Sequence, residues 1–568
     1  MTKLPELPVR QSLRRLEQKT FAGYDRNPGS YDGGIYHMEN LSSEAFPLLT
    51  VRKRRKNIGY YEKINGVYVC DGKLLVAEAA DLRFDGRVVG TVTDTPKTVV
   101  ALGKRLIIFP DKLYFNTAAA GVYEDLATLQ TAVPHPAPNA CYAVGTEAPY
   151  TLYLGDGNQW REYEKECGSL EAAYTGAVTF PAVGSLYDEA AANNTIESTG
   201  VDWSVYFKVG DAVTVSGTVN NNLTAVIREI DGDKLRFYEN LFTEETAAAA
   251  TVARKVPDFD YLCAANNRLW GCKGDEIRCS KLGDPFNFEV FDGIATDSYG
   301  VETGTAGDFT GCYCYLGYPT FFKEDKIFKI YGTRPADFSL LSAMSRGVAQ
   351  GSGSSLAVAG ERLFYLSPQG VTIYGGGVPE SLQHPFGELR FREGCGVSDG
   401  SRYYLAATDR DGNRHLFCYD TGNRIWVRED DTAVTAAVCY RGKACFATAT
   451  GELLLADGEE DTVAGGQESQ VRWFAEFGDF VAATPTKKHL TKVILRLEPR
   501  EGAYAEVWVS YDGGAYRQCG GRITGNGKKS CYLPLIPRRC DAFRLKISGC
   551  GPCNIYGLAV EYATGSPL

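Results

Sequence analysis

Methionine and histidine are scarce in this sequence, and long apolar runs are missing from it. The 568 residues include three Met and five His. The histidines are scattered along the chain, so the sequence does not present the clustered ligands that a zinc site needs. No stretch approaches the roughly 20 consecutive apolar residues of a membrane-spanning helix. The opening segment 1–21 has no continuous apolar core, so we expect no secretory signal and predict folding in a cytoplasm.

An excess of basic charge is also missing. The formal net charge is −10. General nucleic-acid binders usually present a basic face, so this balance argues against one, although it leaves room for a local basic patch. An acidic surface would instead let DNA slide past without adhering.

Cysteine is the exception to this scarcity, with 17 copies in the chain. The number is odd and no export signal is expected, so a disulfide framework is disfavoured. Several cysteines, such as Cys70 and Cys445, lie in segments that resemble β-strands in sequence. We therefore predict reduced thiols that act as small hydrophobic side chains.

Turn formers and aromatic residues are abundant, and they follow a repeating pattern. Each copy is a turn, often with a basic residue, followed by a strand of bulky side chains. The copies lie at residues 65–70, 103–109, 266–272, 318–323, 360–366, 400–406 and 442–448. Neighbouring copies in the better-preserved stretches are about 40 residues apart, which is the spacing of propeller blades. Residues 396–430 divide into four strands separated by turn residues, as one blade requires.

The predicted fold class is therefore all-β, with a β-propeller of seven or eight blades. We count residues 148–163 as the third blade. Strands in a blade are covered on both faces, which explains why apolar residues are consecutive in the bulky strands. A pair of β-sandwiches is the alternative arrangement of the same strands.

Changes in composition predict the domain boundaries. Residues 168–256 are rich in Ala and Thr and predict a small inserted β-barrel with a tight turn at Asp231–Gly232. The final segment has well-separated strands, typical of a jelly-roll sandwich. The predicted parts are an N-terminal arm at 1–57, a propeller at 58–167 and 257–465, the inserted barrel at 168–256, and the sandwich at 466–568.

Three short motifs resemble catalytic signatures, and none predicts chemistry here. Cys550-Gly-Pro-Cys553 matches a thioredoxin motif, but strand-like text flanks it and no helix follows to activate the thiol. The segment 520–530 lacks the spacing of a phosphate-binding loop. The single Asp-box-like turn at 510–516 is explained by a hairpin. We predict no enzymatic activity, no catalytic residue, no cofactor and no metal site.

The N-terminal arm carries the candidate interface. A short apolar run in it is followed by five consecutive basic residues. The candidate interface residues are Phe46, Leu48, Leu49, Arg52, Lys53, Arg54, Arg55 and Lys56. Two interpretations remain open for the basic residues: a solvated strand edge, or a contact with an acidic partner surface or DNA.

Several segments of the chain resemble bacteriophage tail proteins of the nozzle or stabilisation type. The resemblance lies in the arm text "GGIYHMENLSSEAFPLLTVRKRR", in "SKLGDPFNF" at 280–288, and in strand pairs at 321–332 and 363–382. The last residues resemble the sandwich that closes many phage tail components. The resemblance implies a non-enzymatic virion protein, assembled in the host bacterial cytoplasm.

The resemblance also implies partners. Such proteins form rings, usually of six copies, around a DNA exit channel, and contact portal, adaptor and tail-fibre proteins. DNA would pass without sequence-specific binding. The arm would then reach across the propeller or onto a neighbouring subunit, with Phe46, Leu48 and Leu49 as anchors.

Two other functions compete with this one. The first is a carbohydrate- or receptor-binding tail protein that uses the C-terminal sandwich or exposed aromatic residues such as Trp160 and Trp508. The second is a propeller hydrolase, which would need a cluster of acidic residues in the central channel.

Overall fold

The chain folds into two compact units in a computed structural model, one made of Met1–Lys63 with Val348–Leu568 and the other of Ile64–Gly347. Strands dominate both units, and the one α-helix among the described residues is α1, Leu126–Ala132. The structure describes residues 13–27, 34–117, 121–133, 135–136, 140–147, 149–155, 157–167, 170–171, 174–179, 193–458, 464–480, 487–536 and 538–564.

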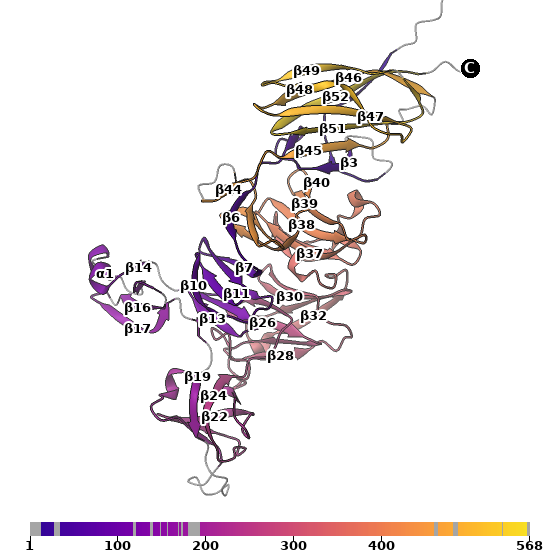
Figure 1. The fold of residues 1–568 in the computed structure, drawn as a ribbon. Coiled ribbons are helices and arrows are strands. Elements are labelled where there is room, and N and C mark those ends of the chain that lie inside the picture. Colours follow the sequence, from indigo (N-terminus) through magenta and orange to yellow (C-terminus); the bar gives the residue numbers. More distant parts are fainter. Residues whose placement is uncertain are drawn as a thin grey trace, which may run out of the picture. The chain divides into compact units, whose positions relative to one another are not determined.

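The second unit, Ile64–Gly347, contains four blade-like sheets of four antiparallel strands each (Figure 1). Their strands, in chain order, are β7 (Ile64–Cys70), β8 (Lys73–Glu78), β9 (Asp81–Phe84) and β10 (Arg87–Thr91); β11 (Thr98–Leu102), β12 (Arg105–Phe109), β13 (Leu113–Asn116) and β18 (Leu170–Glu171); β25 (Tyr261–Ala265), β26 (Arg268–Lys273), β27 (Glu276–Cys279) and β28 (Tyr299–Glu302); β29 (Gly311–Tyr315), β30 (Tyr318–Lys323), β31 (Lys326–Tyr331) and β32 (Ser339–Met344).

The first unit contains three more blade-like sheets, two with four strands and one with five. Their strands are β33 (Ala357–Ala359), β34 (Arg362–Ser367), β35 (Gly370–Tyr374) and β36 (Glu380–Ser381); β37 (Phe391–Ser398), β38 (Arg402–Asp409), β39 (Arg414–Asp420) and β40 (Ile425–Asp430); β41 (Val434–Tyr440), β42 (Lys443–Thr448), β43 (Glu452–Leu455), β6 (Lys56–Tyr60) and β44 (Gly466–Gln467). The last sheet includes β6, which comes from the N-terminal part of the chain and pairs with β43. The predicted fold class, all-β with propeller blades, is confirmed.

The sequence repeat corresponds to the hairpin between the first two strands of a blade. In several blades both turn residues have positive φ, as at Asn266–Asn267 (52° and 55°) and Arg441–Gly442 (51° and 74°). This is the geometry of a type I′ turn, which matches the right-handed twist of the strands. The strand after the turn is buried almost throughout, as in β30 and β34. Burial on both faces explains its consecutive apolar residues.

Residues 148–163, predicted as the third blade, belong to an insertion instead. The fourth strand of the second blade is β18, so the residues between β13 and β18 form an insertion in that blade. The insertion contains α1 and a separate sheet. The strands of this sheet are β14 (Val122–Tyr123), β15 (Cys141–Val144), β16 (Tyr150–Gly155) and β17 (Trp160–Cys167). Its first pair, β14 with β15, is parallel, unlike the antiparallel first pair of a blade.

The predicted inserted barrel is present and closed. Its strand order is β19 (Tyr174–Thr179), β20 (Thr195–Glu197), β23 (Lys234–Phe237), β22 (Thr224–Asp231), β21 (Ala212–Ser216) and β24 (Thr246–Arg254). The predicted turn after Asp231 joins β22 to β23, and Gly232 has a φ of 56°. The barrel has a core of its own, with Trp203, Phe237 and Phe242 fully buried.

Polar contacts attach the barrel to the sheet that contains β25 to β28. Arg254 donates from Nε to Asp211 at 3.1 Å and from Nη1 to Asp284 at 2.8 Å. Asn287 donates from Nδ2 to the other oxygen of Asp211 at 2.8 Å. Asp284 and Asn287 belong to the "SKLGDPFNF" segment after β27. This segment therefore holds the base of the barrel.

We expect the barrel to be removable. Replacement of residues 172–254 by a short Gly-Ser linker should leave the remainder soluble and shift its melting temperature by only a few degrees, because the barrel buries its own core. Thermal unfolding followed by circular dichroism, with the full chain as control, measures the shift. Loss of cooperative unfolding would mean that the barrel is part of the propeller core.

The C-terminal part of the first unit is a β-sandwich of two sheets. One sheet is six-stranded, in the order β2 (Gly23–Tyr24), β3 (Gly34–Glu39), β45 (Arg472–Phe477), β51 (Phe543–Cys550), β47 (Tyr504–Tyr511) and β48 (Arg517–Thr524). The other contains β4 (Leu41–Ser42), β5 (Leu49–Val51), β52 (Cys553–Thr564), β46 (Lys488–Pro499) and β49 (Lys529–Pro534), with β1 (Arg14–Gln18) paired to β52 and β50 (Arg539–Cys540) to β46.

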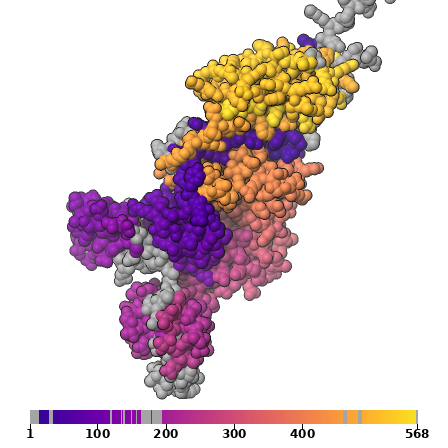
Figure 2. Space-filling view, in the orientation of Figure 1, coloured from indigo at the N-terminus to yellow at the C-terminus, as the bar shows by residue number. Residues whose placement is uncertain are grey.

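The predicted boundary between arm and sandwich is therefore wrong. Five strands of the arm, β1 to β5, belong to the two sheets of the sandwich, as the indigo segments beside the yellow ones show in Figure 1 and Figure 2. The arm also supplies core residues: Ile35, Met38, Leu41 and Leu49 are 0–3% exposed. The alternating burial of these strands requires a second sheet to cover them, and the end of the same chain provides it.

Candidate functional site

A groove lies on the outer face of the six-stranded sheet of the sandwich. Side chains alternate across this sheet, as expected for a strand with one buried face. In β45, Trp473 and Ala475 are buried, while Arg472 is exposed and Phe474 is half-buried. The register pairs Phe474 with Ser548 on β51, and Ser548 with Glu506 on β47. Residues far apart in the sequence thus share one face.

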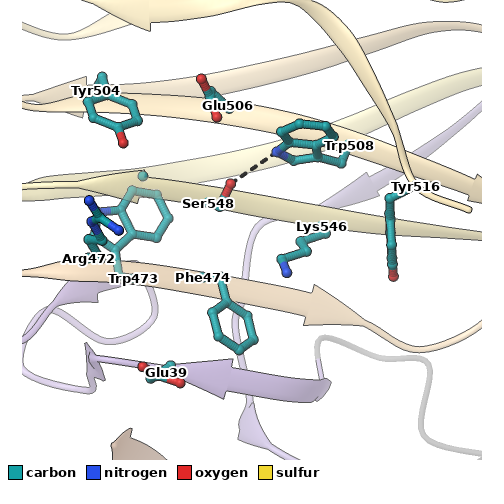
Figure 3. Close-up of a pocket in the computed structure, with 11 residues that line it drawn as sticks. Glu39, Arg472, Trp473, Phe474, Tyr504, Glu506, Trp508, Tyr516, Lys546 and Ser548 are labelled. Atoms are coloured by element: carbon teal, nitrogen blue, oxygen red, sulfur yellow. Dashed lines mark hydrogen bonds between the residues drawn. The ribbon is translucent and has the colours of Figure 1, made fainter.

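The groove has a volume of about 540 Å³, which is within the range of small-ligand sites. Four of its lining residues carry outward aromatic rings, and polar groups are interleaved with them (Figure 3). The groove is lined by Glu39, Arg472, Trp473, Phe474, Tyr504, Glu506, Trp508, Tyr516, Lys546, Ser548 and Gly549.

Polar contacts orient the rings of the groove. The indole Nε1 of Trp508 donates a hydrogen bond to Ser548 Oγ at 3.0 Å (Figure 3). The Nζ of Lys546 lies 4.4 Å from the centroid of the Phe474 ring. The guanidinium of Arg522 lies 3.9 Å from the centroid of Tyr504. Cation–π contacts and hydrogen bonds of this kind fix ring orientation before a ligand arrives.

The charges of the groove are unequally neutralised. Glu506 accepts a hydrogen bond from Arg522 Nε at 2.9 Å. Glu39 forms an ion pair with Arg428 at 3.2 Å. Within the described part of the chain, no carboxylate lies within ion-pair distance of Arg472 or Lys546. The lining carboxylates are therefore paired and the lining cations are not.

Tyr516 at the rim is uncharged at neutral pH. Burial raises the pKa of its hydroxyl, and the nearby Glu476 carboxylate raises that pKa further. A neutral phenol can both donate and accept a hydrogen bond. Tyr516 therefore adds no charge to the groove.

The candidate interface residues of the arm lie elsewhere, and three of them, Leu49, Arg52 and Arg55, are buried. Arg55 is 3% exposed and binds Glu429 and Asp430, the latter at 2.8 Å. Arg52 is 7% exposed and binds Glu468 through both terminal nitrogens, each at 2.8 Å. These five side chains form what we call the arm ion-pair cluster. The acidic surface expected opposite these two arginines belongs to the chain itself.

The arm ion-pair cluster lowers carboxyl pKa values. Burial alone would raise the pKa of Asp430, but the charges of Arg55 and Arg52 and the hydrogen bonds from Thr432 and Arg55 lower it to about 2. In Glu468, the same two arginines outweigh burial and lower the pKa. Both carboxylates are charged at neutral pH, so the cluster is an ionic contact.

The remaining candidate interface residues differ in accessibility. Lys53 forms an ion pair with Glu44 at 2.8 Å, and both side chains are partly exposed. Leu49 is buried in the sandwich. Four others are half-buried: Phe46, Leu48, Arg54 and Lys56. Their role in contacting another subunit stays a prediction.

The Cys550-Gly-Pro-Cys553 motif forms the turn between β51 and β52, as its flanks predict. Gly551 has a φ of 81°. Both cysteines are free, as are the other cysteines whose side chains the structure describes. Burial raises the pKa of Cys553 to about 12. A thiol with that pKa is protonated at neutral pH and a poor nucleophile.

The sequence predicts only some of the residues that line the groove. Trp508 was predicted as a binding aromatic and lines the groove, whereas Trp160 is 9% exposed and packs edge-on against Tyr142 in another sheet. Phe474 and Lys546 were missed. The available signal was the alternation of aromatic and charged residues in "RWFAEF" and "YAEVWVSY".

Among the described residues, no three His, Cys, Asp or Glu side chains gather closely enough to hold a metal ion. None of the helices in the described ranges has the length and apolar character needed to cross a membrane.

Comparison with known proteins identifies distant structural likenesses only. No family model matches the chain, and no curated protein matches it. An exo-β-1,3-galactanase from Phanerochaete chrysosporium is 11% identical, over 52% of this chain and 92% of that one, with a TM-score of 0.20. BamB from Moraxella catarrhalis is 12% identical, over 51% and 94%, with a TM-score of 0.23.

A third likeness is longer but equally weak. PorZ from Porphyromonas gingivalis is 10% identical, over 89% of this chain and 78% of that one, with a TM-score of 0.26. Similarities of this size carry no argument about function. The resemblance to phage tail proteins is not tested by them and stays a prediction.

Proposed function

We propose that the chain is a non-enzymatic structural protein of a bacteriophage tail, forming a nozzle-like ring around the DNA exit channel. Its partners would be further copies of itself, the adaptor and portal proteins, and the tail fibres. The observation that supports this proposal is the sharing of strands between the two ends of the chain. The sheet of the last blade contains β6, which directly precedes the first blade in sequence. Pairing with β6 covers the edge that β43 would otherwise expose.

The arm supports the same proposal. The sandwich contains β1 to β5, and the arm ion-pair cluster joins the arm to the end of β40. First and last segments of the chain are thus secured together. The net charge of −10 suits a protein that lets DNA pass without retaining it.

Projection images test the ring. Purified full-length protein, alone and mixed with a phage adaptor protein, should give ring-shaped particles, six-fold by the resemblance. Antibody labelling of phage particles should place the protein at the tail. A monomer under both conditions, together with unlabelled tails, would contradict the proposal.

A second function is favoured by the groove. An open sheet face with oriented aromatic rings and interleaved polar groups suits the binding of a carbohydrate. The sugar rings of a carbohydrate have apolar faces and hydroxyl groups at their edges. Under this alternative the chain is a carbohydrate-binding tail protein that uses its C-terminal sandwich. The two functions are compatible in one protein, because the groove and the blades are different parts of it.

A further inference from the structure

We infer that the groove on the sandwich takes an acidic saccharide, one whose sugar rings carry carboxylate groups. This inference rests on the second proposed function and adds the chemical class of the ligand. It does not depend on ring formation by the propeller. Three observations carry it: the placing of the rings, the pairing of the charges, and the fixed orientation of Trp508.

The rings and cations alternate across neighbouring strands. Lys546 on β51 is in register with Trp508 on β47, and its ammonium lies 4.4 Å from the Phe474 ring on β45. In the view of Figure 3, Lys546 lies between Phe474 on one side and Trp508 and Tyr516 on the other. A sugar that packs on Trp508 therefore has a cation beside it.

The balance of charge in the groove favours a negatively charged ligand. Glu506 and Glu39 are held by Arg522 and Arg428. Glu476 is opposite Lys546 in register, but its carboxylate lies 4.0 Å from Arg544. Arg472 and Lys546 are thus the two lining charges for which no carboxylate of the described residues lies within 4.0 Å. Carboxylates of the ligand would pair with them, and charge-assisted hydrogen bonds are the stronger ones.

The orientation of Trp508 favours a saccharide over an apolar peptide. Its only polar atom already donates to Ser548 at 3.0 Å, so its remaining contribution is the ring surface. The groove is not a continuous apolar strip, because charged side chains separate its rings. Apolar patches for protein partners are usually contiguous.

Binding of oligosaccharides to the full-length protein tests the inference. The probes are tetragalacturonate, which is acidic, and galactotetraose, which is neutral, measured by isothermal titration calorimetry at low salt. We expect the acidic probe to bind about tenfold more tightly, the effect of one charge-assisted hydrogen bond. Lys546→Gln should reduce this preference while leaving weak binding of the neutral probe. Trp508→Ala should weaken both probes about tenfold or more.

The other sheet of the sandwich offers a matched control. Tyr532 on β49 is 66% exposed, and the ammonium of Lys492 lies 5.7 Å from its ring. The double variant Lys492→Gln/Tyr532→Ala removes the same kinds of side chain outside the groove. Its binding of both probes should equal that of the unchanged protein. Thermal unfolding of every variant shows whether it is folded.

The outcomes distinguish the inference of an acidic ligand from the proposed carbohydrate-binding function. Equal binding of both probes, with no effect of Lys546→Gln, would overturn the acidic ligand and leave the carbohydrate-binding module standing. No binding of either probe, and none on a glycan array, would overturn both. Equal weakening by the control variant would mean that binding is non-specific, and would also overturn the inference.

Discussion

Replacement of Arg55 by alanine is expected to lower the free energy of unfolding of the first unit by about 3–5 kcal/mol. The side chain is 3% exposed, and Glu429, one of its partners, is 7% exposed. Without Arg55, two carboxylates remain in a buried site with one cation fewer, and an unpaired buried charge is costly. Urea-induced unfolding followed by circular dichroism measures the change.

Lys53 provides the matched control for this prediction. It lies in the same basic segment, but its ion pair with Glu44 is partly exposed. Lys53→Ala should therefore change the free energy of unfolding by less than about 1 kcal/mol. Equal effects of the two replacements would show that burial does not distinguish Arg55 from Lys53.

The arm ion-pair cluster also predicts acid sensitivity. The pKa of Asp430 falls from an ordinary 3.8 to about 2 on folding. A lowered pKa in the folded state contributes stability that is complete above pH 4 and is lost as the pH falls towards 2. The difference in stability between the unchanged protein and Arg55→Ala should shrink over this same window. A constant difference from pH 5 to pH 2 would contradict the assignment.

Removal of residues 1–51 is expected to leave the C-terminal sandwich unfolded. Each of the buried side chains Ile35, Met38, Leu41 and Leu49 contributes about 1.5–3 kcal/mol by burial. Their combined loss is comparable with the whole stability of a typical domain, about 5–15 kcal/mol. The deletion also exposes the edges of β45 and β52, which β3, β1 and β5 otherwise pair with. Solubility and limited proteolysis of the truncated chain measure the effect.

A complementation experiment sharpens this result. The segment 464–564 produced alone should be insoluble or protease-sensitive, and co-production with a peptide covering residues 13–55 should restore a folded complex. A shorter deletion, of residues 1–12, serves as the control and should leave the chain soluble. A well-folded 464–564 fragment would contradict the role that we assign to the arm.

The sequence predicts the local features of this fold well. A turn followed by a bulky strand is a local signal, so the blade hairpins at Asn266–Asn267 and Arg441–Gly442 could be found from their spacing. The barrel could be found because its composition changes along the chain. These predictions depend on residues that are close together in sequence.

Long-range pairing could not be predicted in this way. Arg14 on β1 pairs with Tyr562 on β52, and no periodicity in either strand specifies that partner. The five basic residues 52–56 look equivalent in sequence, yet Arg55 is buried in the arm ion-pair cluster and Lys53 is not. The groove is assembled from three strands of the final segment and one of the arm, so its residues have no fixed spacing.

The order in which the chain leaves the ribosome gives the paired ends a kinetic consequence. Strand β1 is synthesised first, but its partner β52 ends at Thr564. At about 5–20 residues per second, β1 waits for roughly half a minute to two minutes. The sandwich therefore folds only after β52 has been made, when the blades have already had time to form. During that interval the arm is an unpaired, partly apolar segment, and its basic residues act as gatekeepers against premature association.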